Sequence, residues 1–337
     1  THFFNPPRYL KLLEIIPTQD TLREVLEVIT HFGEYRLGKG IVLCKDTPNF
    51  IGNRIAFGGG AYALDYILEN GYSVDEVDAL TGPLIGRPKT ATFRLIDLVG
   101  VDVWDHVGRN LAEAIPHDQR VMPYLSSERV NRMIGEMIRK GWLGNKSKVG
   151  FYKAVTVDGS REFWSLDLQS MEHAAPTKPR FESVGKAKDI EDLGERMSIF
   201  ISGSDRAAEL VRALTFQSLA YASALVPEVA DTPLPIDNAV RWGFQHEAGP
   251  FEIWDMLGVE ATLEAIVKAG FAPAAWVREM LDGGHTSFYR YQNGQKTGVY
   301  NVITKTYDVF ERSPQYINLV SLKSAGKVIS ENPGASL

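Results

Sequence analysis

The feature that most constrains the fold of this 337-residue chain is an internal repeat. Three short apolar segments from its first half recur, in the same order, in its second half. The matching pairs are 61–63 with 220–222, 93–101 with 251–259, and 151–153 with 288–290. Chance similarity between apolar segments is the alternative, but three matches in a common order favour a duplicated domain. We therefore expect two related helical units.

The first unit is predicted to begin with one long helix over residues 50–70, with Gly58-Gly59-Gly60 in its middle. A glycine inside a helix costs about 1 kcal/mol relative to alanine. Three in a row therefore suggest the close approach of another helix or a local distortion. Residues 151–164, divided by Asp158-Gly159, are predicted to form a β-hairpin. The later copy of this segment also precedes a turn signal, Asn293-Gly294.

The first 46 residues show a different pattern. Residues 10–17 alternate as in a strand, with Glu14 on the same face as its apolar neighbours. A helix is expected next, with Thr18 as its N-cap and Gly33 as its end. Residues 41–44 then read as a short buried strand. Strand, helix and strand in this order indicate the end of an α/β sheet.

The first candidate for chemistry is a histidine paired with a carboxylate. Glu14 lies in an apolar run, and His2 opens the motif His2-Phe3-Phe4-Asn5-Pro6-Pro7. A carboxylate is costly to bury unless it is paired, and a histidine placed just before the same strand is its natural partner. Such a pair is a positioned proton acceptor, which an alcohol dehydrogenase without a metal needs. A loop histidine beside an exposed strand residue is the alternative.

Composition argues against several other kinds of partner and site. The net charge of −6 argues against nucleic acid as the main partner. Cys44 is the only cysteine, so an internal disulfide and a cysteine-based zinc site are excluded, and a reducing compartment is favoured. The remaining histidines show no ligand spacing, which argues against a metal site. With no apolar run of membrane-spanning length, we expect a cytoplasmic, bacterial-type location.

Four features together resemble the 3-hydroxyacyl-CoA dehydrogenase family. In chain order they are the opening His-Phe-Phe-Asn-Pro motif, Glu14, the Asn53-Arg54 pair and Gly150-Phe151-Tyr152. The resemblance covers roughly residues 1–155, with a weaker second copy over about 195–310. It implies a mainly α fold, in which the terminal strands of a Rossmann-type α/β domain precede two related helical domains similar to the C-terminal domain of 6-phosphogluconate dehydrogenase.

The resemblance also implies an organisation of the chain into five parts. These are a C-terminal remnant of the Rossmann NAD-binding domain at 1–46, a first helical domain at 47–167, a linker at 168–190, a second helical domain at 191–315, and a connector at 316–337. We find no Gly-x-Gly-x-x-Gly that follows a strand, so the chain is expected to lack most of the NAD-binding domain. In some family members the connector would lead into an enoyl-CoA hydratase domain.

By this resemblance the reaction belongs to fatty-acid β-oxidation. It oxidises the 3-hydroxyl of 3-hydroxyacyl-CoA to a ketone and transfers hydride to NAD. His2 would accept the hydroxyl proton, Glu14 would orient its ring and stabilise the imidazolium, and Asn53 would hydrogen-bond the substrate. For Asn53, a helix–helix hydrogen bond is the structural alternative.

Two further residues would bind the cofactor. Asn5 would lie near the nicotinamide, unless it is a turn residue that bonds its own backbone. Lys146 would reach toward the cofactor, unless it is a solvated loop charge. Lys148 stands where the family commonly has glycine, so either lysine could serve.

The second copy shows no counterpart of His2 or Glu14, and Arg212 aligns with Asn53. We therefore interpret it as a structural copy packed on the first, and a homodimer is plausible for helical domains of this kind. The chain alone is expected to be inactive. The alternatives are a non-catalytic helical module for dimerisation or structure, and a dehydrogenase of similar build that acts on another hydroxy acid.

Overall fold

The computed structural model describes residues 1–292, 295–310, 322–323, 326–332 and 335–337. The chain begins with a three-stranded sheet in the order β1-β2-β3. Its strands are β1 (His2–Phe3), β2 (Leu12–Ile15) and β3 (Gly40–Leu43). β1 pairs antiparallel with β2, and β2 pairs parallel with β3. Parallel strands need a crossover connection, and helix α1 (Arg23–His31) provides it.

Two predictions about this crossover helix were wrong. The residue before α1 is Leu22, not Thr18. The Thr18 hydroxyl, which would have capped the helix, instead forms a hydrogen bond with the Thr21 hydroxyl at 3.1 Å. Gly33 does not end the helix, since α1 continues directly into a π-helical turn, η1 (Phe32–Arg36). A Cβ at Gly33 would lie 2.8 Å from the Ile41 side chain. The glycine thus allows the turn to pack closely on the sheet.

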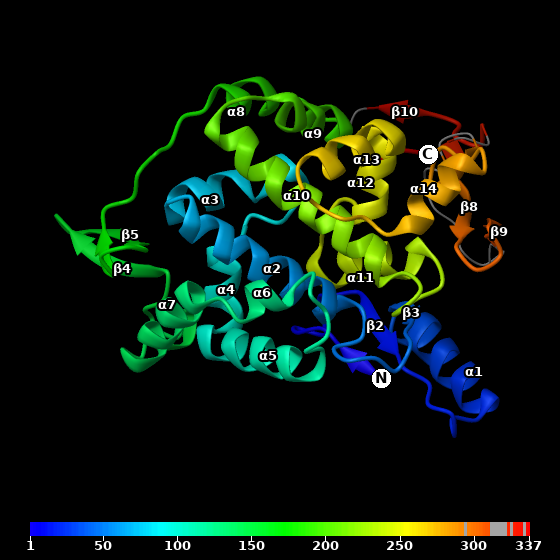
Figure 1. Cartoon of the computed structure of the whole chain (residues 1–337), viewed down its shortest axis with the longest axis horizontal. Coiled ribbons are helices and arrows are strands. Elements are labelled where there is room, and N and C mark those ends of the chain that lie inside the picture. The colour runs from blue at the N-terminus through cyan, green and yellow to red at the C-terminus, as the bar shows by residue number, and fades with distance from the viewer. Residues whose placement is uncertain (293–294, 311–321, 324–325, 333–334) are drawn as a thin grey trace.

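The remaining elements form two helical units, as predicted, and the mainly α fold is confirmed (Figure 1). The first unit contains α2 (Gly52–Glu69), α3 (Val74–Leu80), η2 (Pro83–Ile85), α4 (Phe93–Val99), α5 (Val101–Ala114), α6 (Met122–Leu125), α7 (Glu128–Arg139), η3 (Asn145–Ser147), β4 (Tyr152–Val157), β5 (Ser160–Asp167) and β6 (Glu172–Ala174). The second contains α8 (Glu182–Ala187), α9 (Leu193–Ser202), α10 (Arg206–Leu225), α11 (Pro233–Phe244), α12 (Pro250–Leu257), α13 (Val259–Lys268), α14 (Ala275–Asp282), β7 (Tyr289–Gln292), β8 (Gln295–Asn301) and β9 (Thr306–Val309). A short pair, β10 (Glu331–Asn332) and β11 (Ala335–Ser336), follows.

The units repeat each other down to their buried hydrogen bonds. Asp97 on α4 accepts the backbone N–H groups of residues 151–152 at 2.8 and 2.9 Å. Asp255 on α12 accepts those of residues 288–289 at 2.7 and 3.0 Å. Burial raises the pKa of Asp97 to about 6 and that of Asp255 to about 7, against the effect of these bonds. An equivalent aspartate therefore binds the start of the equivalent strand in each unit.

A second hydrogen bond, from a tyrosine to an aspartate, is also repeated in the two units. The Tyr152 hydroxyl donates to Asp78 on α3 at 2.8 Å, and the Tyr289 hydroxyl donates to Asp237 on α11 at 2.6 Å. Each unit also ends in a three-stranded antiparallel sheet, in the orders β4-β5-β6 and β7-β8-β9. The predicted hairpin turn at Asp158-Gly159 is confirmed, since β4 ends and β5 begins beside it. The second predicted turn, Asn293-Gly294, lies outside the described residues.

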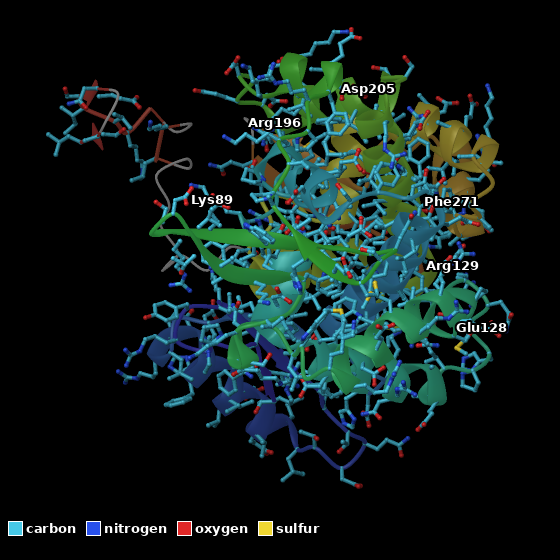
Figure 2. All side chains as sticks on the ribbon, turned by 90° about the vertical axis from the view of Figure 1, so that its left-hand side faces the viewer. Lys89, Glu128, Arg129, Arg196, Asp205 and Phe271 are labelled. Atoms are coloured by element: carbon cyan, nitrogen blue, oxygen red, sulfur yellow. The ribbon has the colours of Figure 1, made fainter. Side chains whose placement is uncertain are left out.

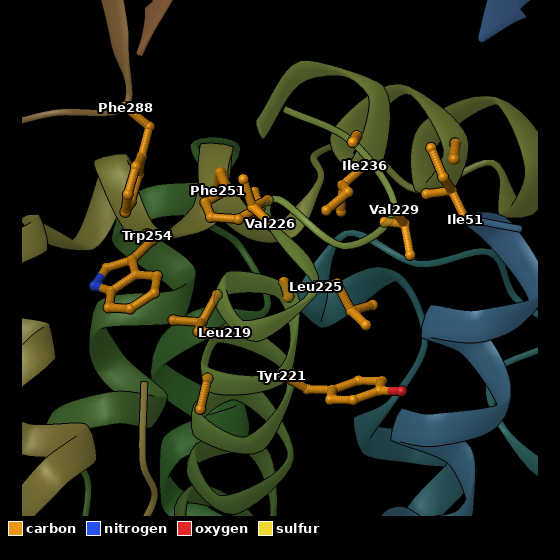
Figure 3. Packing of buried hydrophobic residues seen from close by; sticks show 14 of the residues in the cluster. Ile51, Leu219, Tyr221, Leu225, Val226, Val229, Ile236, Phe251, Trp254 and Phe288 are labelled. Carbon is orange, nitrogen blue, oxygen red and sulfur yellow. The ribbon is translucent and has the colours of Figure 1, made fainter. Parts of the chain in front are cut away.

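The long helices α2 and α10 cross at the centre of the molecule (Figure 1). Figure 3 shows the Tyr221 ring reaching from α10 toward α2. A Cβ at Gly58 would lie 2.4 Å from that ring, and one at Gly60 would lie 2.3 Å from the Trp104 ring. The glycines thus serve close approach, which was one of the two predicted reasons for them.

The predicted division of the chain into domains stays a prediction. The segment 168–190, expected to be a linker, carries β6 and α8. The expected boundary between 315 and 316 lies outside the described residues. No helix in the described ranges combines the length and the apolar character that crossing a bilayer requires.

Candidate active site

The structure brings His2 and Glu14 together across the first two strands. The register of β1 and β2 places them directly opposite each other. His2 Nδ1 lies 2.6 Å from Glu14 Oε2. The Glu14 side chain is completely buried, whereas that of His2 is 32% exposed. The histidine thus lies on a neighbouring strand and not, as expected, just before the same one.

The other oxygen of Glu14 is held by the start of α2. Glu14 Oε1 accepts the backbone N–H groups of Gly52 at 2.8 Å and of Ile51 at 3.2 Å. The first N–H groups of a helix have no partner within the helix, and the helix dipole favours a negative charge there. Both oxygens of the buried carboxylate are therefore paired. Sequence reasoning missed these two donors, although the predicted helix start at residue 50 was a signal for them.

Aromatic rings frame the histidine. The centroids of the Phe4 and Phe50 rings lie 5.0 and 5.7 Å from that of His2. The Phe4 ring packs on the start of α2, since a Cβ at Gly52 would lie 2.5 Å from it. Because Nδ1 is bonded to Glu14, Nε2 is the nitrogen left for a ligand. The ring is thus fixed in place with one nitrogen available.

Asn53 lies beside this pair. It lies in the first turn of α2 and directly follows Gly52, whose backbone N–H group bonds Glu14. Its side chain is half-buried, and within the described part of the chain it has no hydrogen-bond partner. The helix–helix hydrogen bond considered as an alternative is therefore not formed. Asn5 lies three residues beyond His2, next to Phe4, and is exposed.

The structure gives Lys146 a different partner. Its ammonium forms an ion pair with Asp102, in the first turn of α5, and not with the group around His2. Lys148 is exposed and has a φ of 65°, in the region that favours glycine. The cofactor role of either lysine stays a prediction.

The residue after Asn53 ties α2 to the second unit. Arg54 is fully buried and donates to Tyr221 of α10 at 2.7 Å, to Asp118 at 2.9 Å and to Glu228 at 3.0 Å. Burial acts to lower the arginine's pKa, but Tyr221 and the two carboxylates outweigh it and raise that pKa. The first turn of α2, which carries the site, is therefore anchored to α10.

In the second unit, the residue aligned with Asn53 has a structural contact. Arg212 donates to the backbone oxygens of Ile201 and Gly203, at 3.3 and 2.7 Å. These oxygens belong to the C-terminal end of α9, where a cation is favourable. This contact supports the interpretation of the second unit as a structural copy.

The residues around His2 suit one end of a dinucleotide. The exposed Asn5 amide offers a donor and an acceptor beside His2 for a nicotinamide. The sequence has no Gly-x-Gly-x-x-Gly after a strand to receive the pyrophosphate. The described residues hold no cluster of three or more His, Cys, Asp or Glu side chains that could bind a metal.

Comparisons with known proteins identify the family of the chain. Residues 1–47 match the family model of the 3-hydroxyacyl-CoA dehydrogenase NAD binding domain, and residues 50–154 match that of the C-terminal domain. The chain belongs to the 3-hydroxyacyl-CoA dehydrogenase family. The expectation that it lacks most of the NAD-binding domain was partly wrong, because a segment matching that domain spans residues 1–47.

Relatives in this dehydrogenase family are longer than the chain. A Bacillus subtilis protein named "Probable 3-hydroxyacyl-CoA dehydrogenase" is 41% identical over 337 residues, which are 100% of this chain and 41% of that protein. The fatty acid oxidation complex subunit alpha of Acinetobacter baylyi is 27% identical over 77% of this chain and 32% of that protein. The chain thus spans less than half the length of these curated relatives.

A solved structure shares the fold. The 3-hydroxybutyryl-CoA dehydrogenase from Escherichia coli K12 matches with a TM-score of 0.59 and 22% identity. The match covers 84% of this chain and 70% of that one. At this identity the likeness concerns the fold alone, and it agrees with the terminal Rossmann-type strands and helical domains predicted above.

Proposed function

We propose that this chain carries the catalytic residues of an NAD-dependent 3-hydroxyacyl-CoA dehydrogenase of fatty-acid β-oxidation. The observation that carries the proposal is the His2–Glu14 pair, with one imidazole nitrogen at 2.6 Å from a buried carboxylate and the ring partly exposed. A general base needs a fixed ring, a stabilised protonated form and a free nitrogen. This pair provides all three.

We assign to each residue the role that the family resemblance implies, and the His2–Glu14 geometry supports the roles of that pair. The substrate hydroxyl gives its proton to His2 Nε2 as the bond from C3 to hydrogen breaks and the carbonyl forms. NAD, when bound, accepts the hydride from C3. The carboxylate of Glu14, held by two backbone N–H groups, stabilises the imidazolium without accepting its proton. Asn53 hydrogen-bonds the substrate oxygen, and Asn5 contacts the nicotinamide.

Several wider features belong to the same proposal. Residues 1–337 alone are proposed to be inactive, because they contain no Gly-rich turn for the pyrophosphate. A hydratase domain in the same protein, a homodimer and a cytoplasmic location are likewise proposals.

The experiment compares substrates in an enzyme that joins this chain to a complete NAD-binding domain. NADH formation is measured with 3-hydroxybutyryl-CoA and with free 3-hydroxybutyrate. We expect turnover of the thioester and not of the free acid, and no turnover by residues 1–337 alone. Turnover of the free acid only would favour a dehydrogenase for other hydroxy acids. A folded protein inactive on acyl-CoA of every chain length would favour the non-catalytic module.

A further inference from the structure

Two basic residues lie next to a backbone hydrogen bond that joins the two helical units. Arg87 follows η2 in the first unit, and His246 follows α11 in the second. The backbone N–H of Glu247 donates to the Gly86 oxygen at 2.8 Å. This bond joins the residues next to Arg87 and His246, and the positive charge of Arg87 acts on the His246 ring.

The backbone at this junction is closely fitted. Gln245 has a φ of 58° and ends α11 with a sharp turn, which directs the following residues back toward η2. Gly86 has a φ of 72°, and a Cβ there would lie 2.9 Å from Leu193. Two residues with positive φ and one close contact therefore define the path of the backbone next to Arg87 and His246.

Neither basic side chain has an acceptor. Both are half-buried, and across the described ranges neither forms a hydrogen bond or an ion pair. The neighbouring carboxylate of Glu247 is bound by Arg196 at 3.0 Å. Burial lowers the pKa of Arg87 to about 10, and burial together with Arg87 lowers that of His246 to about 3. An unpaired, partly desolvated guanidinium is costly, and an oxyanion is the partner whose geometry fits it.

A row of rings connects this junction to the candidate active site. The ring centroids of His2 and Phe4 are 5.0 Å apart, those of Phe4 and Phe244 are 5.3 Å apart, and those of Phe244 and His246 are 6.3 Å apart. Phe244 ends α11, two residues before His246. Phe4 itself is buried, so these rings are packed on one another, but their spacing means that the His2 and His246 rings lie less than about 17 Å apart. An acyl-CoA whose reacting carbon lies at His2 is long enough to span that distance.

We propose that Arg87 and His246 form a subsite for an oxyanion of the substrate, a phosphate or a carboxylate. The proposal rests on the proposed function, because the reacting carbon is placed at His2. Two parts of an acyl-CoA could supply the anion: the phosphates of the CoA moiety, or a carboxylate at the far end of a dicarboxylic acyl chain.

The test is steady-state kinetics of the enzyme with its complete NAD-binding domain. Arg87→Met removes the charge at similar size, and His246→Gln keeps a hydrogen-bond donor. The control is Lys89→Met, which removes an exposed lysine from the same segment (Figure 2). Arg87→Met is expected to raise KM for 3-hydroxybutyryl-CoA at least about tenfold, with kcat within about twofold. His246→Gln is expected to raise it less, and Lys89→Met not at all.

Two further substrates distinguish the sources of the anion. 3-Hydroxybutyryl pantetheine lacks the CoA phosphates, and a 3-hydroxyacyl pantetheine with a terminal carboxylate offers the other anion. If Arg87→Met raises KM only for the CoA ester, the anion that Arg87 binds is a CoA phosphate. If it raises KM only for the pantetheine ester with the terminal carboxylate, the anion is that carboxylate. A KM unchanged in Arg87→Met, or raised equally for the uncharged pantetheine ester, would overturn the subsite.

A wild-type enzyme without activity would refute the proposed function itself. Isothermal titration of the wild type and Arg87→Met with CoA and with a dicarboxylate would still test the subsite, since equal affinities of the two proteins for both probes would reject it.

Discussion

At the scale of single residues, Arg54 shows how the site is held in place. It directly follows Asn53, and its guanidinium reaches α10 and Asp118 from the first turn of α2. Asp118 is only 4% exposed as a residue, so it depends on this partner. Removing one member of a buried pair leaves an uncompensated charge in the interior.

We predict that Arg54→Met lowers the free energy of unfolding by about 3–5 kcal/mol. Arg120 pairs with the same Asp118 from the surface, at 3.5 Å, with its own side chain 54% exposed. Arg120→Met should therefore cost only about 0–1 kcal/mol. Urea titration of both variants measures the difference. Equal losses in the two variants would contradict the assignment of Arg54 as the buried anchor.

The sequence predicted the pairing of His2 with Glu14, but not the other partners of Glu14. The two residues meet because the register of β1 and β2 places them opposite each other. The N–H donors from Ile51 and Gly52 depend on where α2 packs against the sheet, which no local pattern specifies. Lys146 was assigned from a loop motif, and only tertiary structure reveals its pairing with Asp102.

At the scale of elements, α2 and the hairpin at 151–164 were predicted well, because a long apolar helix and an Asp-Gly turn each have a strong local signal. The continuation of α1 through Gly33 was not predictable from periodicity, since it depends on the contact of that glycine with the sheet. The glycine triplet of α2 is the converse case. There the sequence indicated a close approach, and the structure supplies its geometry.

For the glycine triplet of α2, we predict that alanine changes the free energy of unfolding in opposite directions at two adjacent positions. Gly58→Ala should destabilise the protein by about 1–3 kcal/mol, because the new Cβ would lie 2.4 Å from a Tyr221 ring that is itself buried. At Gly59 the nearest atom is 3.7 Å away, so Gly59→Ala should stabilise by up to about 1 kcal/mol through helix propensity. Thermal and urea unfolding measure both. Stability changes of the same sign in both variants would refute the close approach of Tyr221 to Gly58 as the reason for this glycine.

At the scale of the whole molecule, the duplication explains the architecture. Equivalent aspartates hold the equivalent strand starts in both units, and the His2–Glu14 sheet, to which we assign the chemistry, precedes the first unit alone. Matching segments in the sequence predicted this arrangement. They could not predict the junction of Arg87 with His246, because contacts between units leave no periodic signal within either one.

In the proposed mechanism, Glu14 keeps the His2 ring in the form whose Nε2 can accept a proton. In Glu14→Gln, an amide that still accepts the N–H groups of Ile51 and Gly52 must turn its NH2 toward His2 Nδ1. The proton of the neutral ring then moves to Nε2, and the base is lost. The most direct test is kcat/KM for 3-hydroxybutyryl-CoA with NAD, in the enzyme with its complete NAD-binding domain. We predict a fall of about 10²–10⁴-fold in a folded variant; a value within about twofold of wild type would contradict the mechanism.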